Sequence, residues 1–366
     1  MGMGAYWGLF AFIILANLFV KQIWADSAVA KKKFMIVAGV ATWIVMGLRS
    51  PQVGQDLASY TYGWDSVLLR SWASIYEDGL MNFETGFSML MKSVQLISSD
   101  FQVFIAVSAA IFVYLIFNTI YKYSSNAFLS VIIFLCFGIF IVSFSAMRQG
   151  LAVAVTFYSI RYIIDKKPIK FVLAVLLAST FHKSAIIFIL AWFARMFVMG
   201  PGLAVGISAV YMALVMPFLR VLTPIIVAFF FGEGYETYTQ NKTGGAITMF
   251  IVYLVVFILS YFVKAPNDKL LSLLRNIALF ATLFQSLGSI SVGTMTRIGY
   301  YYSVFFCLFI PQIMKYFRQS ERMIFTSLAV ILFIFFFYLT THSFGFGTVP
   351  YHFFFEPGYD HVTYTR

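Results

Sequence analysis

Long runs of apolar residues, separated by short polar connections, dominate the chain from end to end. A membrane-spanning helix needs about 20 largely apolar residues, and about 17 suffice when flanking side chains reach the interface. By that measure the pattern predicts about twelve spanning helices, within a range of about 11 to 14. They cover residues 5–20, 34–48, 101–121, 127–144, 151–164, 169–181, 185–197, 203–218, 246–263, 270–290, 298–314 and 323–340. We therefore expect an all-α polytopic membrane protein.

Two further stretches do not fit the length of a span. Residues 81–97 have apolar positions interrupted by several polar side chains, which is typical of an interfacial or re-entrant helix. Residues 221–231 are apolar but short, and they follow Pro217 and Arg220. We interpret them as the second half of a broken helix, because counting them as a span would reverse the side of every later loop.

The composition changes the class of protein that can be considered. Hydrophobic residues make up 61% of the chain and charged residues 11%, whereas about 25% of the residues in a soluble domain are charged. So few charges cannot cover a water-facing surface, and an aromatic content of 20% excludes a disordered chain. The opening segment has neither a basic start nor a small-residue cleavage site, so we interpret it as the first span and not as a signal peptide.

The net charge of +11 is explained by orientation in the membrane and requires no nucleic-acid partner. Cytoplasmic loops of membrane proteins are rich in Lys and Arg, and most of the 25 cations fall on the inner connections if the N-terminus lies outside. The same orientation places the longer loops outside, at 49–100 and 232–245, together with the tail from 341. We expect one transmembrane domain, residues 1–366, whose active face is extracytoplasmic.

Metal and redox chemistry find no support in the sequence. Cys136 and Cys307 both lie inside apolar runs and are too few for a disulfide framework or a thiolate metal site. The histidines are not spaced as a pair on one helical face; they are His182, His342, His352 and His361. We therefore expect neither a metal nor a cofactor.

Several cations lie on the expected outer side within about one turn of an apolar run, where ionisable groups are expensive. They are Arg49, Arg148, His182, Lys183, Arg220 and Arg297. A guanidinium binds phosphate through two parallel hydrogen bonds, even in a partly desolvated site. Any one of these cations could instead reach lipid head groups or pair with an outer carboxylate. Together they indicate a site for an anionic head group.

Four short motifs follow one another along the chain. In the first, Arg49 leaves a helix and is followed by Gly54-Gln55-Asp56 and then Tyr60. The others are MRQGLA at 147–152, TFHKSA at 180–185 and TRIGYY at 296–301. In this order they resemble the EpsG family of bacterial exopolysaccharide proteins, which are Wzy-like polymerases. The chain departs from that family at Glu84-Thr85-Gly86-Phe87, where the family often has Glu-Pro-Gly-Tyr.

The resemblance implies a Wzy-like, GT-C-like glycosyltransferase bundle in the bacterial cytoplasmic membrane. Such an enzyme joins oligosaccharide repeat units carried on undecaprenyl pyrophosphate, at the outer face and without metal or cofactor. Its partners would be that lipid-linked glycan and the bilayer. A chain-length regulator could be a further partner, and no nucleic-acid partner is expected.

The resemblance also implies roles for individual residues. Arg148 and Arg297 are the first candidates to bind the pyrophosphate, followed by Arg49 and Lys183, because cations stabilise a departing phosphate group. Aromatic side chains suited to sugars are Tyr60, Tyr62, Tyr238, Tyr300 and Tyr301. Each of these tyrosines could also belong to the aromatic belt at the membrane interface.

Attack by a sugar hydroxyl benefits from a general base. His182 has a suitable intrinsic pKa, and Asp56 and Glu84 are the carboxylate alternatives. His182 could instead be a hydrogen-bonded packing residue, and Asp56 could pair with Arg49 and shape the loop.

Two other functions stay open on the sequence alone. A flippase or transporter of a lipid-linked or anionic substrate would explain the same cations, although such proteins usually carry them deep in a central cavity and show inverted repeats. A membrane acyltransferase using His182 is the second alternative.

Overall fold

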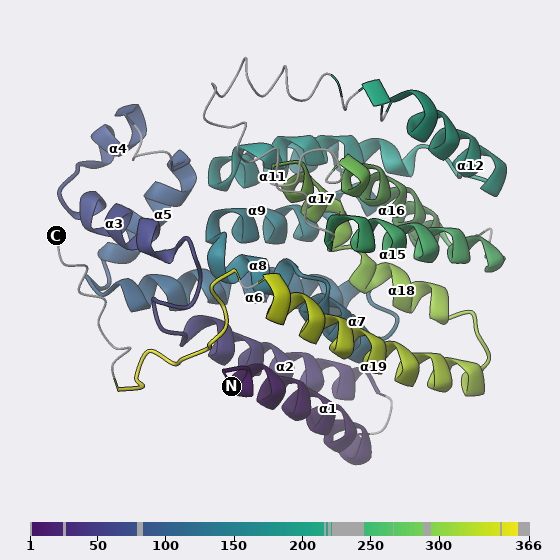
Figure 1. Ribbon diagram of the computed structural model, residues 1–366, viewed down its shortest axis with the longest axis horizontal. Coiled ribbons are helices and arrows are strands. Elements are labelled where there is room, and N and C mark those ends of the chain that lie inside the picture. Colours follow the sequence, from purple (N-terminus) through teal and green to yellow (C-terminus); the bar gives the residue numbers. More distant parts are fainter. Residues whose placement is uncertain are drawn as a thin grey trace.

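The computed structural model describes residues 2–24, 27–78, 83–215, 217–218, 221, 245–265, 267–287, 294–344 and 346–357. Within these residues the secondary structure is helical, and extended backbone pairs at one isolated antiparallel bridge, between Arg49 and Phe353. Figure 1 shows the long helices lying side by side in one bundle, with a group of short helices at one end. The predicted all-α class is confirmed.

Helices cover the predicted apolar runs, although several runs are broken into two pieces. The first half of the bundle contains α1 (Gly4–Trp24), α2 (Ala28–Gly47), α6 (Phe101–Tyr123), α7 (Ala127–Cys136), α8 (Ile139–Ser145), α9 (Met147–Tyr158), α10 (Ile160–Ile164), α11 (Pro168–Phe181) and the 3₁₀ helix η1 (Lys183–Arg195). The second half contains α12 (Pro201–Val210), the π-helical turn η2 (Tyr211–Val215), α15 (Gly245–Leu259), η4 (Ser260–Phe262), α16 (Lys269–Leu287), α17 (Thr294–Ser303), α18 (Phe306–Met314) and α19 (Gln319–Phe344).

Three helices of the described part are long and apolar enough to cross a membrane alone: α1, α6 and the Gln319–His342 part of α19. Helices α7 and α8 make a fourth if they are counted as one span bent by 49°. The break includes Gly138, whose φ of 86° lies in the left-handed region that favours glycine. The structure supports a membrane protein, and the expected number of about twelve spans stays a prediction.

The centre of the bundle is formed by α7, α8 and the start of α9. Every residue of α8 is buried, and most side chains of α7 and α9 are buried on all faces. A helix that is apolar and buried all round belongs to the interior of a large bundle. The N-terminal turn of α9, which carries Arg148, therefore starts inside the protein.

The predicted outer loop at 49–100 folds into three short helices, α3 (Leu57–Leu68), α4 (Trp72–Asp78) and α5 (Thr85–Gln95). On α5 the buried side chains include Phe87, Met91 and Val94, and this spacing places them on one face of a helix. Residues 81–97, predicted as an interfacial or re-entrant segment, thus contain an amphipathic helix that packs on the protein. Figure 1 shows α3, α4 and α5 grouped at one end of the bundle.

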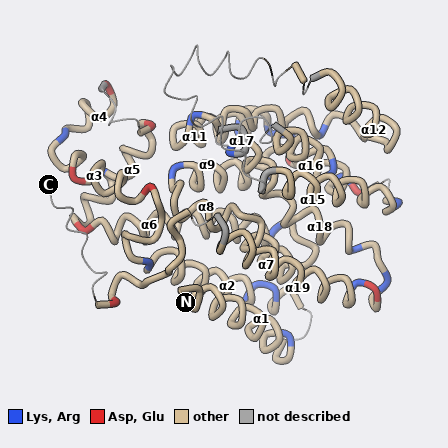
Figure 2. The backbone as a smooth tube through the Cα atoms, in the orientation of Figure 1, with Lys and Arg blue, Asp and Glu red and all other residues tan. Residues whose placement is uncertain are grey.

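Charge is unevenly distributed between the two ends of the bundle. Figure 2 shows Asp and Glu gathered around α3, α4 and α5, and Lys and Arg prominent at the far ends of the long helices. This polarity is what a cytoplasmic end rich in cations requires. In the expected orientation the short helices face outward, and that orientation stays a prediction.

The C-terminal segment 346–357 packs on the loop that follows α2. The amide of Ser50 donates to the carbonyl oxygen of His352 at 2.9 Å, and the amide of Gly54 donates to that of Gly347 at 2.8 Å. Gly54 has a φ of +129°, and a Cβ at this position would lie 2.5 Å from the carbonyl oxygen of Phe144. Glycine is therefore required where this loop passes over the end of α8.

Candidate functional site

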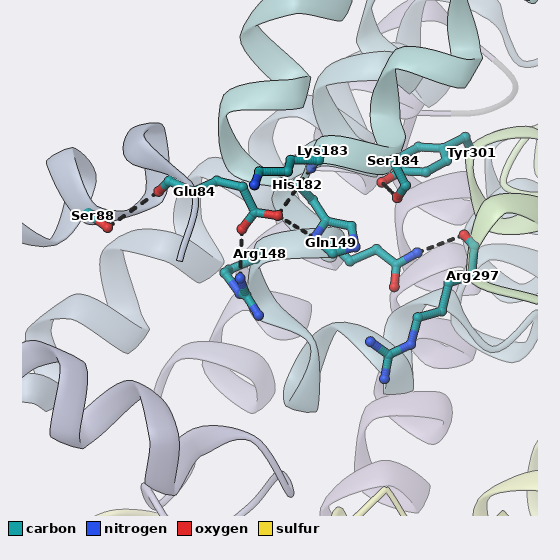
Figure 3. Close-up of polar contacts among 9 residues, drawn as sticks. All are labelled: Glu84, Ser88, Arg148, Gln149, His182, Lys183, Ser184, Arg297 and Tyr301. Carbon is teal, nitrogen blue, oxygen red and sulfur yellow. Dashed lines mark hydrogen bonds and ion pairs between the residues drawn. The ribbon is translucent and has the colours of Figure 1, made fainter. Parts of the chain in front are cut away.

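The carboxylate of Glu84 contacts residues from two distant parts of the chain. Oε2 of Glu84 lies 2.6 Å from Nη1 of Arg148, and Oε1 lies 3.0 Å from Nδ1 of His182. The backbone amide of Lys183 donates to the same Oε1 at 3.1 Å. Figure 3 shows the three groups arranged around the Glu84 carboxylate. The structure therefore brings together four of the predicted site residues.

Glu84 is placed by the first turn of α5, which begins immediately after it. A Cβ on Gly86 would lie 2.7 Å from Cβ of Thr180 and 2.8 Å from its carbonyl oxygen, closer than real atoms approach. Glycine at this position lets α5 touch the last turn of α11. Because His182 directly follows α11, this contact sets the distance between Glu84 and His182.

The Glu84 carboxylate is ionised in this environment. Burial alone would raise its pKa, but the hydrogen bond from His182 and the positive charge of Arg148 outweigh burial and lower the pKa to about 2. A carboxylate with so low a pKa is a poor proton acceptor near neutral pH. The geometry favours Glu84 as the group that orients His182 and Arg148.

Arg148 is held by aromatic rings as well as by Glu84. Its guanidinium carbon lies 4.9 Å from the ring centre of Phe83 and 5.9 Å from that of Tyr60. Tyr60 is 2% exposed, and burial raises the pKa of its hydroxyl to about 12. Tyr60 therefore stays neutral and packs against Arg148, and its burial leaves little of its ring surface open to a glycan.

Arg297 reaches the same region from α17. Its side chain is exposed, and its carbonyl oxygen accepts a hydrogen bond of 2.7 Å from Nε2 of Gln149. Since Gln149 follows Arg148 directly, this bond ties the starts of α9 and α17 together. Figure 3 shows the guanidinium groups of Arg148 and Arg297 extending to the same side of Gln149. Gln149 was not predicted as a site residue because a neutral side chain inside an Arg-containing motif gives no separate signal.

The predicted tyrosines occupy different environments. The hydroxyl of Tyr301 lies 2.9 Å from Oγ of Ser184, two residues after His182, and its side chain is fully buried. Tyr300 is half-buried. Tyr62 is 65% exposed on α3, where its carbonyl oxygen accepts a hydrogen bond from Oγ of Ser66. Tyr238, and also Arg220, lie outside the described residues.

Arg49 is built into the protein interior. Its side chain is fully buried, and its guanidinium donates to the carbonyl oxygens of Val53, Met46 and Phe144. These bonds hold the loop after α2 against the end of α8, so the geometry favours a structural role over a phosphate contact. Asp56 is half-buried at the start of α3, where its amide donates to Oγ of Ser145; the guanidinium of Arg49 binds carbonyls instead of this carboxylate.

Among the residues that the structure describes, no three His, Cys, Asp or Glu side chains form a group that could hold a metal ion. Cys136 and Cys307 are buried and not joined in a disulfide.

The arrangement has the components of a general-base site beside a phosphate-binding site. A neutral histidine whose Nδ1–H donates to a carboxylate presents Nε2 as a proton acceptor. Two arginines lie nearby on α9 and α17, and guanidinium groups stabilise developing negative charge on a phosphate. The contact between Glu84 and His182 therefore supports His182, over Glu84, as the base.

Comparison with known proteins bears on the same segments. No curated protein and no solved structure matches this chain. A profile of the EpsG family matches residues 32–353, which include Glu84, Arg148, His182 and Arg297. Because the match extends over most of the chain, the protein belongs to the EpsG family.

Proposed function

We propose that this protein is a polysaccharide polymerase that joins repeat units carried on undecaprenyl pyrophosphate, at the outer face of a bacterial cytoplasmic membrane. The observation that carries the proposal is the Glu84 carboxylate, which contacts both Arg148 and His182. These residues come from separate motifs, and their meeting at one carboxylate supports a single working site. Membership of the EpsG family supports a polymerase-like role in general.

In this proposal Arg148 and Arg297 bind the pyrophosphate of the donor lipid. Arg148 holds Glu84 through Nη1 at 2.6 Å, and a guanidinium has further N–H donors with which it can bind a phosphate oxygen at the same time. Arg297 is exposed and can approach a phosphate from α17. Lys183 is also exposed beside the cluster and adds positive charge. Removing one such charged donor from a catalytic site typically lowers the rate by about 10²- to 10³-fold.

His182 is proposed to act as the general base. The acceptor sugar's hydroxyl gives its proton to Nε2 while its oxygen forms a bond to the anomeric carbon of the donor. The bond from that carbon to the phosphate oxygen breaks, and undecaprenyl pyrophosphate leaves with the electron pair. Glu84 holds Nδ1 of His182 and stabilises the imidazolium that forms. The positive charge for the leaving group comes from arginines, so the proposed reaction uses no metal.

A lipid substrate also needs an apolar path between helices. A groove of about 630 Å³ lies between α12, α15 and α16, within the size range of small-molecule pockets. Its walls are almost wholly apolar and include Met212, Phe250 and Leu254. Such a surface suits an apolar chain such as a prenyl group.

The experiment that tests the function is deletion of the gene in its own host. A polymerase defect should abolish high-molecular-weight polymer and leave single lipid-linked repeat units exposed at the outer leaflet, where an added glycosidase or periodate can reach them. Loss of a flippase would instead leave the same units protected inside the cell, and loss of an acyltransferase would leave polymer of normal length. Either of these results would overturn the proposal.

A further inference from the structure

The Gln149 amide, next to the candidate site, is hydrogen-bonded at one end only within the described part of the chain. Its side chain is 1% exposed, and Nε2 donates to the carbonyl oxygen of Arg297 at 2.7 Å. A carbonyl only accepts, so this bond fixes which end of the amide faces Arg297. The other end, Oε1, is buried and has no hydrogen-bond partner among the described residues.

A buried acceptor without a donor is unfavourable, because it has lost its bonds to water and gained none in return. One way to satisfy such a group is a donor from outside the folded chain, such as water or a ligand. Figure 3 shows Oε1 of Gln149 turned to the side on which the guanidinium of Arg297 lies. Gln149 also follows Arg148 directly in the chain and is bonded through Nε2 to Arg297, so its amide is next to both arginines proposed to bind phosphate.

The missing donor can therefore come with the phosphate-bearing ligand. The first sugar of a lipid-linked glycan carries hydroxyl groups, and in N-acetylated sugars an amide N–H, next to the pyrophosphate. These groups donate hydrogen bonds, whereas the phosphates and the prenyl chain have no donor to offer near neutral pH. An amide is also the right acceptor here, because a carboxylate at this position would pair with the arginines and compete with phosphate.

We propose that Oε1 of Gln149 accepts a hydrogen bond from a hydroxyl or amide N–H of the sugar attached to the pyrophosphate, which makes Gln149 a specificity-determining residue for the donor. The inference rests on the proposed function and deepens it. Nε2 holds the amide in place on Arg297, and Oε1 recognises the sugar while Arg148 and Arg297 recognise the phosphates.

The chain offers a matched control in Gln102 on α6. Its side chain is 8% exposed, Nε2 donates to the carbonyl oxygen of Gly47 at 2.8 Å, and Oε1 is buried without a partner among the described residues. The local arrangement is therefore the same as that of Gln149, but the anchoring carbonyl belongs to the end of α2. A substitution at Gln102 reports the cost of removing a buried amide away from the arginines.

The test compares binding of two lipids to purified protein in detergent. One probe is bare undecaprenyl pyrophosphate, and the other is the lipid-linked repeat unit extracted from cells that lack the polymerase. In Gln149→Met the affinity for the sugar-bearing lipid should fall roughly tenfold, the effect of one lost hydrogen bond. Because Gln149→Met also removes the bond from Nε2 to the Arg297 carbonyl, the affinity for the bare lipid should fall by a smaller factor than that for the sugar-bearing lipid, and Gln102→Met should change neither. Gln149→Leu supplies the same comparison if the methionine variant does not fold.

Two outcomes would overturn the inference. If both lipids lose affinity by the same factor in Gln149→Met, Gln149 only positions Arg297. If neither loses affinity, Oε1 makes no contact with the sugar. Failure of the proposed function is recognised separately, because wild-type protein would then bind neither lipid in preference to a neutral prenyl alcohol.

Discussion

Oε2 of Glu84 lies 2.6 Å from Nη1 of Arg148, which is 64 positions further along the chain. The other oxygen of the same carboxylate faces Nδ1 of His182. A single side chain at the start of α5 thus holds a cation from α9 and an imidazole that follows α11. The arrangement couples the phosphate-binding part of the site to its base.

The first prediction concerns Glu84 and pH. Its pKa is lowered from an ordinary 4.5 to about 2, so its ionised form stabilises the folded protein above pH 4.5, and this contribution is lost as the pH falls towards 2. The shift corresponds to roughly 3 kcal/mol. Thermal unfolding of the purified protein should show this loss in wild type and lack it in Glu84→Gln.

Glu77 provides the control for this titration, because it is exposed on α4. The Glu77→Gln variant should keep the wild-type dependence of stability on pH. Equal profiles for wild type and Glu84→Gln would contradict the ionised contact between Glu84, Arg148 and His182.

The second prediction concerns the contact between α5 and α11. Replacing Gly86 by alanine places Cβ 2.8 Å from the backbone carbonyl oxygen of Thr180, which cannot turn away as a side chain can. We expect α5 to move off α11, at a cost of about 1 to 3 kcal/mol, and Glu84 to lose His182. Both thermal stability and polymer formation in cells should fall.

Gly8 is the matched control for that substitution, since a Cβ there would meet nothing within 4 Å. Gly8→Ala should leave polymer unchanged and should not lower stability, because alanine favours the helix more than glycine does. A Gly86→Ala variant with wild-type stability would show that α5 tolerates the extra atom and does not set the position of Glu84.

The sequence predicted the members of the site better than their contacts. Arg148 and His182 stood out because ionisable groups at helix ends within apolar runs are rare, and Glu84 stood out as an outer carboxylate. Their meeting depends on how α5 packs on α11, which periodicity does not determine. The break between α7 and α8 at Gly138 could likewise not be predicted from the sequence, because the apolar run continues through it.

Arg49 illustrates the limit of the same signal. Like Arg148, it is a cation at a helix end beside an apolar run, and it opens a family motif. In the structure its guanidinium donates hydrogen bonds to backbone carbonyl oxygens, including that of Phe144. Sequence pattern cannot separate the two arginines, because the partners of Arg49 are main-chain atoms, which every residue carries. Gln149 was missed for the opposite reason, since it has no charge.

A third prediction separates the arginines proposed to bind phosphate from other arginines. Arg148→Ala and Arg297→Ala should each lower polymer formation by roughly 100-fold without reducing the amount of protein in the membrane. Arg148→Lys should rescue poorly, because ammonium lacks the planar fork of guanidinium. Arg195, whose guanidinium lies 4.8 Å from the ring centre of Trp192, is a control, and Arg195→Ala should retain activity. Wild-type polymer from Arg148→Ala would remove that residue from the phosphate site.

A fourth prediction concerns Arg49 and stability. Arg49→Ala leaves the carbonyls of Val53, Met46 and Phe144 without their donor, and each buried unsatisfied acceptor costs about 1 to 3 kcal/mol. We expect a marked drop in the thermal stability of the purified variant. Arg297→Ala, which removes an exposed side chain, should keep wild-type stability. A stable but inactive Arg49→Ala would return Arg49 to the binding site.

The most direct test of the account is chain extension by purified protein in detergent, supplied only with lipid-linked repeat units. We expect a ladder of longer glycans, with one undecaprenyl pyrophosphate released for each unit joined. The His182→Gln variant keeps a polar side chain but lacks the proton-accepting imidazole, so it should still bind the lipid-linked unit yet extend it far more slowly. If wild-type protein returned every repeat unit at its original length, with no lipid pyrophosphate released, the account of this site as a polymerase would be contradicted.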